Sequence, residues 1–299
     1  MRTLTHTVTP QEAGRAVRSV APRCFSLGQH AFRRLKVLEA ITVNGEVARA
    51  GRILQAGDVL CVRLPSDDGE PVTPCTPQDS PLPASFIRHI DEDVIVMSKG
   101  APLPTLPASH ITSGTLREQL IAMLGADAAS FAYHPVNRLD KGTSGLLVIA
   151  RHAHAQRLLT AQLHTGNFIR EYLAVTEGVP AEARGVIDAP IARLGTGARR
   201  AVREGGLHAV THYRVEQVVG GRALLRLRLE TGRTHQIRVH LAHFGCPIVG
   251  DYLYGSELPE LRGRFALHSA YLSCRQPITG KQLDITEPLP EALQALLNG

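Results

Sequence analysis

Uninterrupted apolar runs along the chain predict buried strands. Such runs occupy residues 94–99 (VIVMSK), 146–151 (LLVIAR) and 171–178 (EYLAVTEG), and their length suits strands rather than helices. Residues 211–230 instead alternate apolar and polar side chains on both sides of a Gly-Gly pair. That alternation predicts a hairpin of two half-buried strands.

A helix is predicted at residues 234–245 (THQIRVHLAHFG). Thr234 is a suitable N-cap residue, and Gly245 is a suitable residue to follow the last turn. The apolar stripe of this helix consists of Ile237, Leu241 and Phe244. Strands interleaved with a few helices predict an α+β fold, with a mixed, mainly antiparallel sheet flanked by helices.

The N-terminal part predicts a separate small unit. Residues 30–40 (HAFRRLKVLEA) carry apolar side chains at helical spacing, and residues 59–64 predict a strand. Between them, residues 41–47 (ITVNGEV) alternate around an Asn-Gly pair, which is a strong hairpin signal. A basic helix beside a small hairpin sheet therefore predicts a compact α/β module.

Residues 65–84 separate this module from the rest of the chain. They contain six prolines and four acidic residues but no Lys or Arg. Proline disrupts helices and central strands, so we expect a semi-extended linker. The predicted organisation is a small basic module at 1–64, a linker at 65–84 and a larger domain at 85–299.

Charge and cysteine content favour a protein with a polyanionic partner and argue against a disulfide-stabilised or zinc-binding protein. The formal net charge is +6, and residues 1–64 hold ten Lys and Arg against four Asp and Glu, which suits a polyanionic partner. The five cysteines form no C-x-x-C pair, the N-terminus lacks a signal-peptide core, and no apolar run approaches 18 residues. We expect a cytoplasmic protein with free thiols, no structural metal and no membrane segment.

The stretch NRLDKGTSGL (137–146) places one acid, Asp140, between Arg138 and Lys141. An aspartate before a glycine-containing turn often caps that turn with its carboxylate. Alternatively, the two cations would keep a reactive carboxylate ionised, and the following apolar run would hold it rigidly. The residues alone leave both interpretations open.

Common site motifs are missing from the sequence. It has no P-loop, no G-x-G-x-x-G after a strand and no G-x-S-x-G. His235, His240 and His243 lack the spacing of a zinc helix. The donor-rich stretch TGRTHQIRVH (231–240) is either a solvated helix start or a site that pairs with a carboxylate and contacts phosphate oxygens.

Four segments resemble, in the same order, the motifs of the RluA-type pseudouridine synthases. They are HPVNRLDKGTSGLLVIAR (134–151), REYLAV (170–175), LETGRTHQIRVHLAHFGCPIVGDYLYG (229–255) and LHSAYLSCRQPITGKQLDITEPLP (267–290). The resemblance covers about residues 85–290. Gly142 stands where the family usually has an acid, and Gly100 and Pro102 also depart from its pattern, so the departures concern loop shape.

The resemblance implies an isomerase that converts uridine to pseudouridine in RNA without a cofactor or metal. It assigns the catalytic carboxylate to Asp140 and the arginine that fills the vacated base stack to Arg138. Tyr172 would pack under the flipped base, and Arg238 would pair with the carboxylate. Whether Asp140 attacks the anomeric carbon or removes a ribose proton stays open.

The N-terminal module is similar to a small RNA-binding domain of a ribosomal small-subunit protein. This similarity implies phosphate contacts from Arg33, Arg34 and Lys36, although a solvated helix face is the alternative. The expected substrate is large-subunit rRNA, with tRNA as the second choice. We expect a monomer.

Two other classes of function compete with an isomerase. An RNA-binding or ribosome-assembly factor without catalytic activity would not need Asp140, Arg138, Tyr172 and Arg238 together. A glycosidase would need a second acid flanking the sugar bond, and these motifs offer no obvious one. The isomerase is therefore the leading hypothesis.

Overall fold

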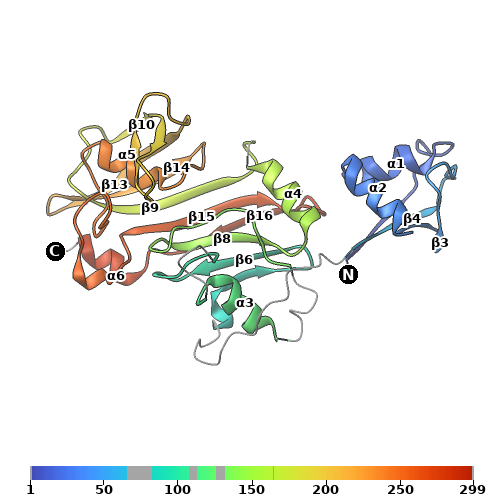
Figure 1. Ribbon diagram of the computed structural model, residues 1–299, viewed down its shortest axis with the longest axis horizontal. Helices are drawn as coiled ribbons and strands as arrows, with labels where there is room; N and C mark the ends of the chain where they lie inside the picture. Colours follow the sequence, from blue (N-terminus) through green and yellow to red (C-terminus); the bar gives the residue numbers. More distant parts are fainter. Residues whose placement is uncertain (1, 66–82, 108–112, 126–131, 164, 298–299) are drawn as a thin grey trace.

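The computed structural model describes residues 2–65, 83–107, 113–125, 132–163 and 165–297. A small N-terminal unit (blue) stands beside a larger unit built on one broad sheet (Figure 1). The predicted linker lies mostly outside the described residues. The domain boundaries at 64 and 85 therefore stay a prediction.

The N-terminal unit pairs a four-stranded sheet, in the order β1-β4-β2-β3, with two helices. Its elements are β1 (Arg2–Thr7), α1 (Val17–Cys24), α2 (Gln29–Val37), β2 (Ile41–Val43), β3 (Glu46–Val47) and β4 (Val59–Leu64). Asn44 and Gly45 have φ angles of 52° and 86°, as a type I′ turn requires. The predicted hairpin, helix and strand are confirmed, and the unit has its own apolar core.

The larger unit is built on a ten-stranded sheet whose main path is β10-β13-β14-β9-β15-β8-β6-β5, with β16 beside β15 and β7 beside β8. Its strands are β5 (Ile87–Ile90), β6 (Val94–Lys99), β7 (His134–Pro135), β8 (Ser144–Ala150), β9 (Ile169–Glu177), β10 (Arg184–Asp188), β13 (Val210–Val219), β14 (Arg222–Leu229), β15 (Leu267–Arg275) and β16 (Gln282–Thr286). Within the described residues, β15 and β8 pair in parallel and the other strand pairs are antiparallel. The mixed, mainly antiparallel α+β fold is confirmed.

Helices and short elements surround this sheet (Figure 1). They are α3 (Leu116–Leu124), α4 (Ala153–Gln162), α5 (Gln236–His243) and α6 (Glu291–Gln294), the β11 (Ile191–Arg193) and β12 (Arg200–Val202) hairpin, and the 3-10 turns Ala84–Phe86, Pro259–Leu261 and Ala295–Leu297. No helix in the described residues is long and apolar enough to cross a bilayer.

The predicted strands correspond closely to the observed ones. Strand β6 has the predicted bounds, β8 and β9 each begin two residues earlier than predicted, and β13 and β14 meet at the Gly-Gly pair. Every residue of β6 and β8 is buried, as continuous apolar runs require. These two strands place a rigid support directly behind the loop that contains Asp140.

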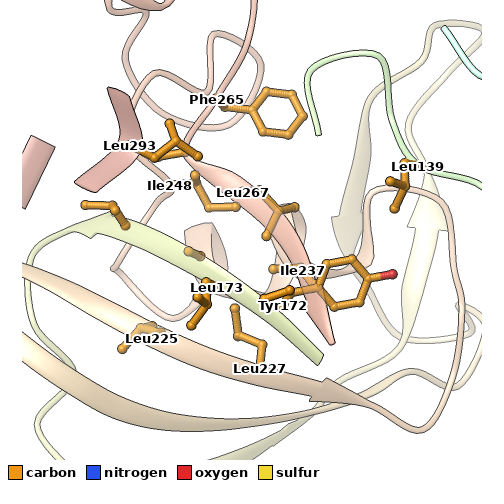
Figure 2. Packing of buried hydrophobic residues seen from close by; sticks show 14 of the residues in the cluster. Leu139, Tyr172, Leu173, Leu225, Leu227, Ile237, Ile248, Phe265, Leu267 and Leu293 are labelled. Atoms are coloured by element: carbon orange, nitrogen blue, oxygen red, sulfur yellow. The ribbon is translucent and has the colours of Figure 1, made fainter. Parts of the chain in front are cut away.

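The main core lies on the face of the sheet that α5 covers. Figure 2 shows Leu225 and Leu227 from β14 in one cluster with Tyr172 from β9, Ile237 of α5 and Leu267 of β15. Strands β9, β14 and β15 and helix α5 thus enclose one apolar layer. That layer fixes α5 against the sheet.

Gly145 allows β8 and β15 to approach each other closely. Its φ is +104°, and a Cβ at this position would overlap the backbone of Ser269. Only glycine combines this conformation with this space. The close approach anchors the beginning of β8, five residues after Asp140.

The N-terminal unit contacts the larger unit at the start of β6. Arg2 donates from Nε to Asp93 at 2.9 Å and also pairs with Glu92. Arg157 of α4 donates to the carbonyl oxygen of Ser26, and Ile278 packs against the N-terminal core. The two units are therefore joined by an ion pair and an apolar contact as well as by the chain.

Candidate active site

Asp140 lies in the loop between β7 and β8, and its carboxylate is 29% exposed. The backbone amide of Thr143 donates to the carbonyl oxygen of Asp140 at 3.0 Å, which closes the turn. Thr105 donates from its hydroxyl to the carbonyl oxygen of Leu139 at 2.9 Å. The turn is thus closed by backbone, and the carboxylate of Asp140 remains available for other partners.

Lys99 supports the same loop from below. Its buried ammonium donates to the carbonyl oxygens of Gly100 and Leu103 at 2.8 Å and to that of Lys141 at 3.3 Å. Burial lowers the pKa of Lys99 to about 7, while the negative charge of Asp140 acts in the opposite direction. A lysine at the end of β6 therefore pins the residue that follows Asp140.

Arg238 of α5 joins two carboxylates. Its Nη1 donates to Oδ2 of Asp140 at 3.0 Å, while Nε and Nη2 donate to Oδ2 and Oδ1 of Asp251 at 2.7 and 2.8 Å. The side chain of Arg238 is 3% exposed. Burial opposes its charge, but the bonds and charges of Asp251 and Asp140 outweigh burial and raise its pKa. The guanidinium is a fixed cation that aims one donor at Asp140.

Two aromatic rings and two backbone amides hold this arrangement. The Cζ atom of Arg238 lies 4.2 Å from the ring centroid of Phe265 and 5.0 Å from that of Tyr254. The amides of Leu253 and Tyr254 donate to Oδ1 of Asp251 at 3.1 and 3.3 Å. Arg238 and Asp251 therefore have little freedom to reorient.

Helix α5 begins differently from the sequence prediction. The residue before its first turn is His235, in a left-handed conformation with φ of 59°, so the prediction of Thr234 as N-cap is wrong. The side-chain oxygen of Gln236 accepts from the amide of Arg233 at 2.9 Å instead. Phe244 is also wrong as a core residue, because it is 41% exposed and packs against Tyr213.

His235 lies beside Asp140 as a result of this left-handed turn. Its Nε2 is 4.0 Å from Oδ2 of Asp140, and its Nδ1 is hydrogen-bonded to the hydroxyl of Tyr254 at 2.8 Å. Burial lowers the pKa of His235, Asp140 opposes that effect, and the charge of Arg238 reinforces it. A neutral imidazole therefore adjoins the carboxylate at neutral pH.

Tyr172 of β9 completes the predicted set from the other side. It is 5% exposed, and Figure 2 shows its hydroxyl pointing out of the apolar cluster on the side where Leu139 lies. Burial raises the pKa of Tyr172, and the charge of Asp140 adds to this effect. The phenol is therefore neutral and close to Asp140.

Arg138 stands apart from this group. Its side chain is exposed, as is that of Lys141, and neither makes an ion pair with Asp140 in the described part of the chain. The cation paired with Asp140 is Arg238, from a segment 98 residues away. Of the predicted residues, the structure brings Asp140, Arg238 and Tyr172 together.

Sequence reasoning missed Asp251, His235, Tyr254 and Phe265 as members of the site. Asp251 and Tyr254 lie in the conspicuous stretch CPIVGDYLYG, but nothing in that stretch reveals the partner of a carboxylate. His235 lies in the donor-rich stretch 231–240, but its sequence position does not single it out from the other donors there.

One group of metal-type donors occurs among the described residues, far from Asp140 in the sequence. His6, Glu12 and Cys24 bring their donor atoms within 4.8 Å of one another. Hydrogen bonds from the amide of Thr9 and from His6 lower the pKa of Glu12 to about 2. The carboxylate already anchors a turn of the N-terminal unit, and nothing connects it to the site around Asp140.

The arrangement presents one carboxylate to a ligand. Oδ2 of Asp140 is directed by Arg238, and no hydrogen bond within the described residues occupies Oδ1. A carboxylate fixed in direction, partly exposed and adjoined by a neutral imidazole and a neutral phenol suits nucleophilic attack or proton removal.

Comparisons with known proteins agree with this chemistry. The sequence profile described as RNA pseudouridylate synthase matches residues 93–243. A Xanthomonas campestris protein named ribosomal large subunit pseudouridine synthase D is 40% identical over 270 residues, which cover 86% of this chain and 80% of that protein. The Bacillus subtilis protein named uncharacterized RNA pseudouridine synthase YjbO is 35% identical over 260 residues, covering 87% and 90% of the two chains.

A solved structure shows the same fold. Human RNA pseudouridylate synthase domain containing 4 superposes with a TM-score of 0.58 at 26% identity, and the match covers 72% of this chain and 92% of that one. The sequence motifs, the geometry around Asp140 and these similarities lead to one conclusion. The chain belongs to the RNA pseudouridylate synthase family, in its RluA-type branch, and is an isomerase that acts on RNA.

Proposed function

We propose that this protein converts uridine to pseudouridine in large-subunit rRNA, with Asp140 as the catalytic carboxylate. The observation that carries the proposal is the bond of 3.0 Å from Arg238 to Asp140, made by an arginine that Asp251 holds from behind. Relatives named ribosomal large subunit pseudouridine synthase D support rRNA as the substrate. A transfer RNA is the alternative substrate.

The reaction rearranges bonds without an oxidant or reductant. The bond from N1 of uracil to the ribose C1′ breaks, a bond from C5 to C1′ forms, the hydrogen on C5 leaves to water and N1 gains a proton. Asp140 either bonds to C1′ or removes a ribose proton while the base detaches. Either role needs a carboxylate with a fixed direction, which the hydrogen bond from Arg238 to Oδ2 provides.

The target uridine has to leave the base stack before it reaches Asp140. Flipping a base out of folded RNA costs a few kcal/mol. We propose that Arg138 fills the vacated space, which suits its exposed side chain, and that Tyr172 packs against the flipped base. The phenol ring of Tyr172 is held by the core around Ile237, so the base would meet a rigid surface.

The N-terminal unit would supply further contacts with the RNA backbone. Arg33, Arg34 and Lys36 are exposed on α2, whereas Phe32 and Leu35 of the same helix are buried. One face of α2 is therefore anchored in the core while the other offers cations to phosphates. We also propose that the protein is a monomer in the cytoplasm. The free thiols of the four described cysteines suit a reducing compartment.

A map of the modified uridines tests the substrate. Unmodified large-subunit rRNA and a tRNA pool are incubated with the wild-type protein or with Asp140→Asn, treated with a carbodiimide that marks pseudouridine, and read by reverse transcription. New stops in rRNA, made by the wild type alone, are expected. Stops confined to tRNA would overturn the rRNA assignment, and equal stops with Asp140→Asn would overturn the role of Asp140.

A further inference from the structure

Arg170 is a buried arginine to which the described residues supply no acidic partner. It lies in β9, is 9% exposed, and its Nε is buried without a hydrogen-bond partner. Within the described residues, no carboxylate forms an ion pair with it. Burial of an unpaired charge is costly, so this arginine needs a reason beyond folding.

The position of Arg170 relates it to the site around Asp140. It precedes Tyr172 by two residues, so both side chains leave β9 on the same face of the sheet. The charges of Arg170 and Asp140 both act on the phenol of Tyr172, which burial keeps neutral. Arg170 is therefore close enough to the proposed base-binding surface to contact a nucleotide bound there.

The guanidinium of Arg170 adjoins the loop that leads into α5. A Cβ built on Gly232 would lie 3.5 Å from Nη1 of Arg170, and the Cζ atom is 5.9 Å from the ring centroid of Phe168. These contacts define where the guanidinium lies without neutralising it. Gly232 also leaves space beside Nη1 that a side chain would fill.

Arg238 and Arg170 differ in their acidic partners. Arg238 is 3% exposed and has Asp140 and Asp251 as partners. Arg170 has the same planar fork of donors, which matches the oxygens of a carboxylate or a phosphate, but no such group faces it within the described residues. The absent anion would have to come from the substrate.

We propose that Arg170 binds a backbone phosphate that flanks the target uridine. RNA carries one phosphate per nucleotide, and a phosphate next to the uridine held between Asp140 and Tyr172 is the nearest anion the substrate offers. This inference rests on the proposed placement of the uridine. The contact would hold the nucleotide in register while its base rotates, and it would be the same before and after the bond at C1′ breaks.

The first experiment compares Arg170→Met with wild type in thermal unfolding and in steady-state tritium release from [5-³H]uridine rRNA. A phosphate contact is made equally in the ground and transition states, so its loss should raise KM and leave kcat nearly unchanged. Loss of one charge-assisted hydrogen bond corresponds to a rise in KM of about ten- to hundredfold, and kcat should change less than about threefold. The Tm should stay equal or rise, since an unpaired buried charge is removed. Arg228→Met is the matched control, because Arg228 is exposed on β14 opposite Glu171, on the other face of the sheet.

The second experiment identifies the phosphate. The shortest rRNA fragment that contains a mapped target is synthesised with a single uncharged methylphosphonate on the 5′ or the 3′ side of the target uridine. Binding is measured in the Asp140→Asn background with and without Arg170→Met. One of the two neutral linkages should weaken binding when Arg170 is present and have little further effect when it is absent.

Three results would overturn the proposal. Equal losses with and without Arg170 at both linkages would show that it contacts neither phosphate. A fall in kcat at unchanged KM would assign Arg170 to the uracil chemistry instead. A lower Tm with unchanged KM would make it a structural residue. A failure of the proposed function would look different, because the wild type itself would then release no tritium from any RNA.

Discussion

Arg238 and Asp251 form a buried, two-pronged ion pair, with Nε–Oδ2 and Nη2–Oδ1 distances of 2.7 and 2.8 Å and side chains that are 3% and 0% exposed. Asp251 does not face a substrate in this arrangement. It accepts from Nε and Nη2 of Arg238 and leaves the remaining nitrogen, Nη1, aimed at Asp140. The direction of Asp140 thus depends on a carboxylate that does not touch it.

Replacing Asp251 tests this dependence. Asp251→Asn removes one charge from a buried pair, which should lower the free energy of unfolding by about 3–5 kcal/mol. It should also lower kcat more than it changes KM, because Arg238 would no longer hold Asp140 in one direction. Urea titration and steady-state tritium release measure the two effects.

Glu216→Gln is the matched control for Asp251→Asn. Glu216 pairs with Arg226 at 2.8 Å, but both side chains are partly exposed, so its loss should cost less than about 1 kcal/mol. Equal small losses for both variants would contradict the role given to Asp251.

Gly142, the departure from the family pattern beside Asp140, has a steric explanation in this chain. A Cβ at this position would lie 2.5 Å from the ring of Phe265, and that ring packs against the guanidinium of Arg238. Gly142→Ala should therefore lower the free energy of unfolding by about 1–3 kcal/mol through overpacking and reduce kcat by displacing Arg238. Gly197→Ala, at a position with no atom within 4 Å, is the control, and wild-type kcat in Gly142→Ala would refute the link.

The contact between the two units should be sensitive to acid. Burial opposes ionisation of Asp93, but hydrogen bonds from His152, Arg2 and Gln276 outweigh it and lower its pKa to about 2. A lowered carboxyl pKa contributes stability that is present above pH 3.8 and is lost as the pH falls through about 2.

Comparison with Asp93→Asn isolates this contribution. The quantity to compare is the free energy of unfolding of the wild type minus that of Asp93→Asn, measured by urea titration at several pH values between 2 and 5. This difference should be about 2 kcal/mol larger at pH 5 than at pH 2. A difference that does not change with pH would contradict the ionised state of Asp93. Arg2→Met should remove part of the same difference.

The cations of α2 should set the salt dependence of RNA binding. If Arg33, Arg34 and Lys36 each neutralise a phosphate, replacing all three by glutamine should reduce the slope of log K against log salt concentration by about 2. Filter binding at several salt concentrations measures the slope, and kcat at saturating RNA should stay unchanged. An unaltered slope would mean that these side chains form only a solvated face.

Local patterns predicted the elements whose formation is decided locally. Strand β4 and strand β6 have their predicted bounds, because turn residues flank a short apolar run in each case. The Asn44-Gly45 turn followed equally from local chemistry, since both residues tolerate positive φ.

Features that depend on tertiary contacts were not predictable in this way. Thr234 is a good N-cap residue by type, yet Gln236 takes over the start of α5 and His235 turns the chain toward Asp140. Arg2 and Asp93 meet across 91 residues, which no periodicity reveals. The family resemblance identifies Asp140 and Arg238. The role of Asp251 follows only from the structure, which shows its ion pair with Arg238.

The most direct test of the proposed reaction measures the release to water of the hydrogen on C5 of uridine. Full-length protein and Asp140→Asn are incubated with cellular rRNA and tRNA that carry tritium at that carbon, and binding of both proteins to the same RNA is measured in parallel. The wild type should release tritium to water and Asp140→Asn should release none, with similar binding. Release by Asp140→Asn at the wild-type rate would contradict the catalytic role of Asp140, and binding by the wild type without any release would contradict the isomerase activity.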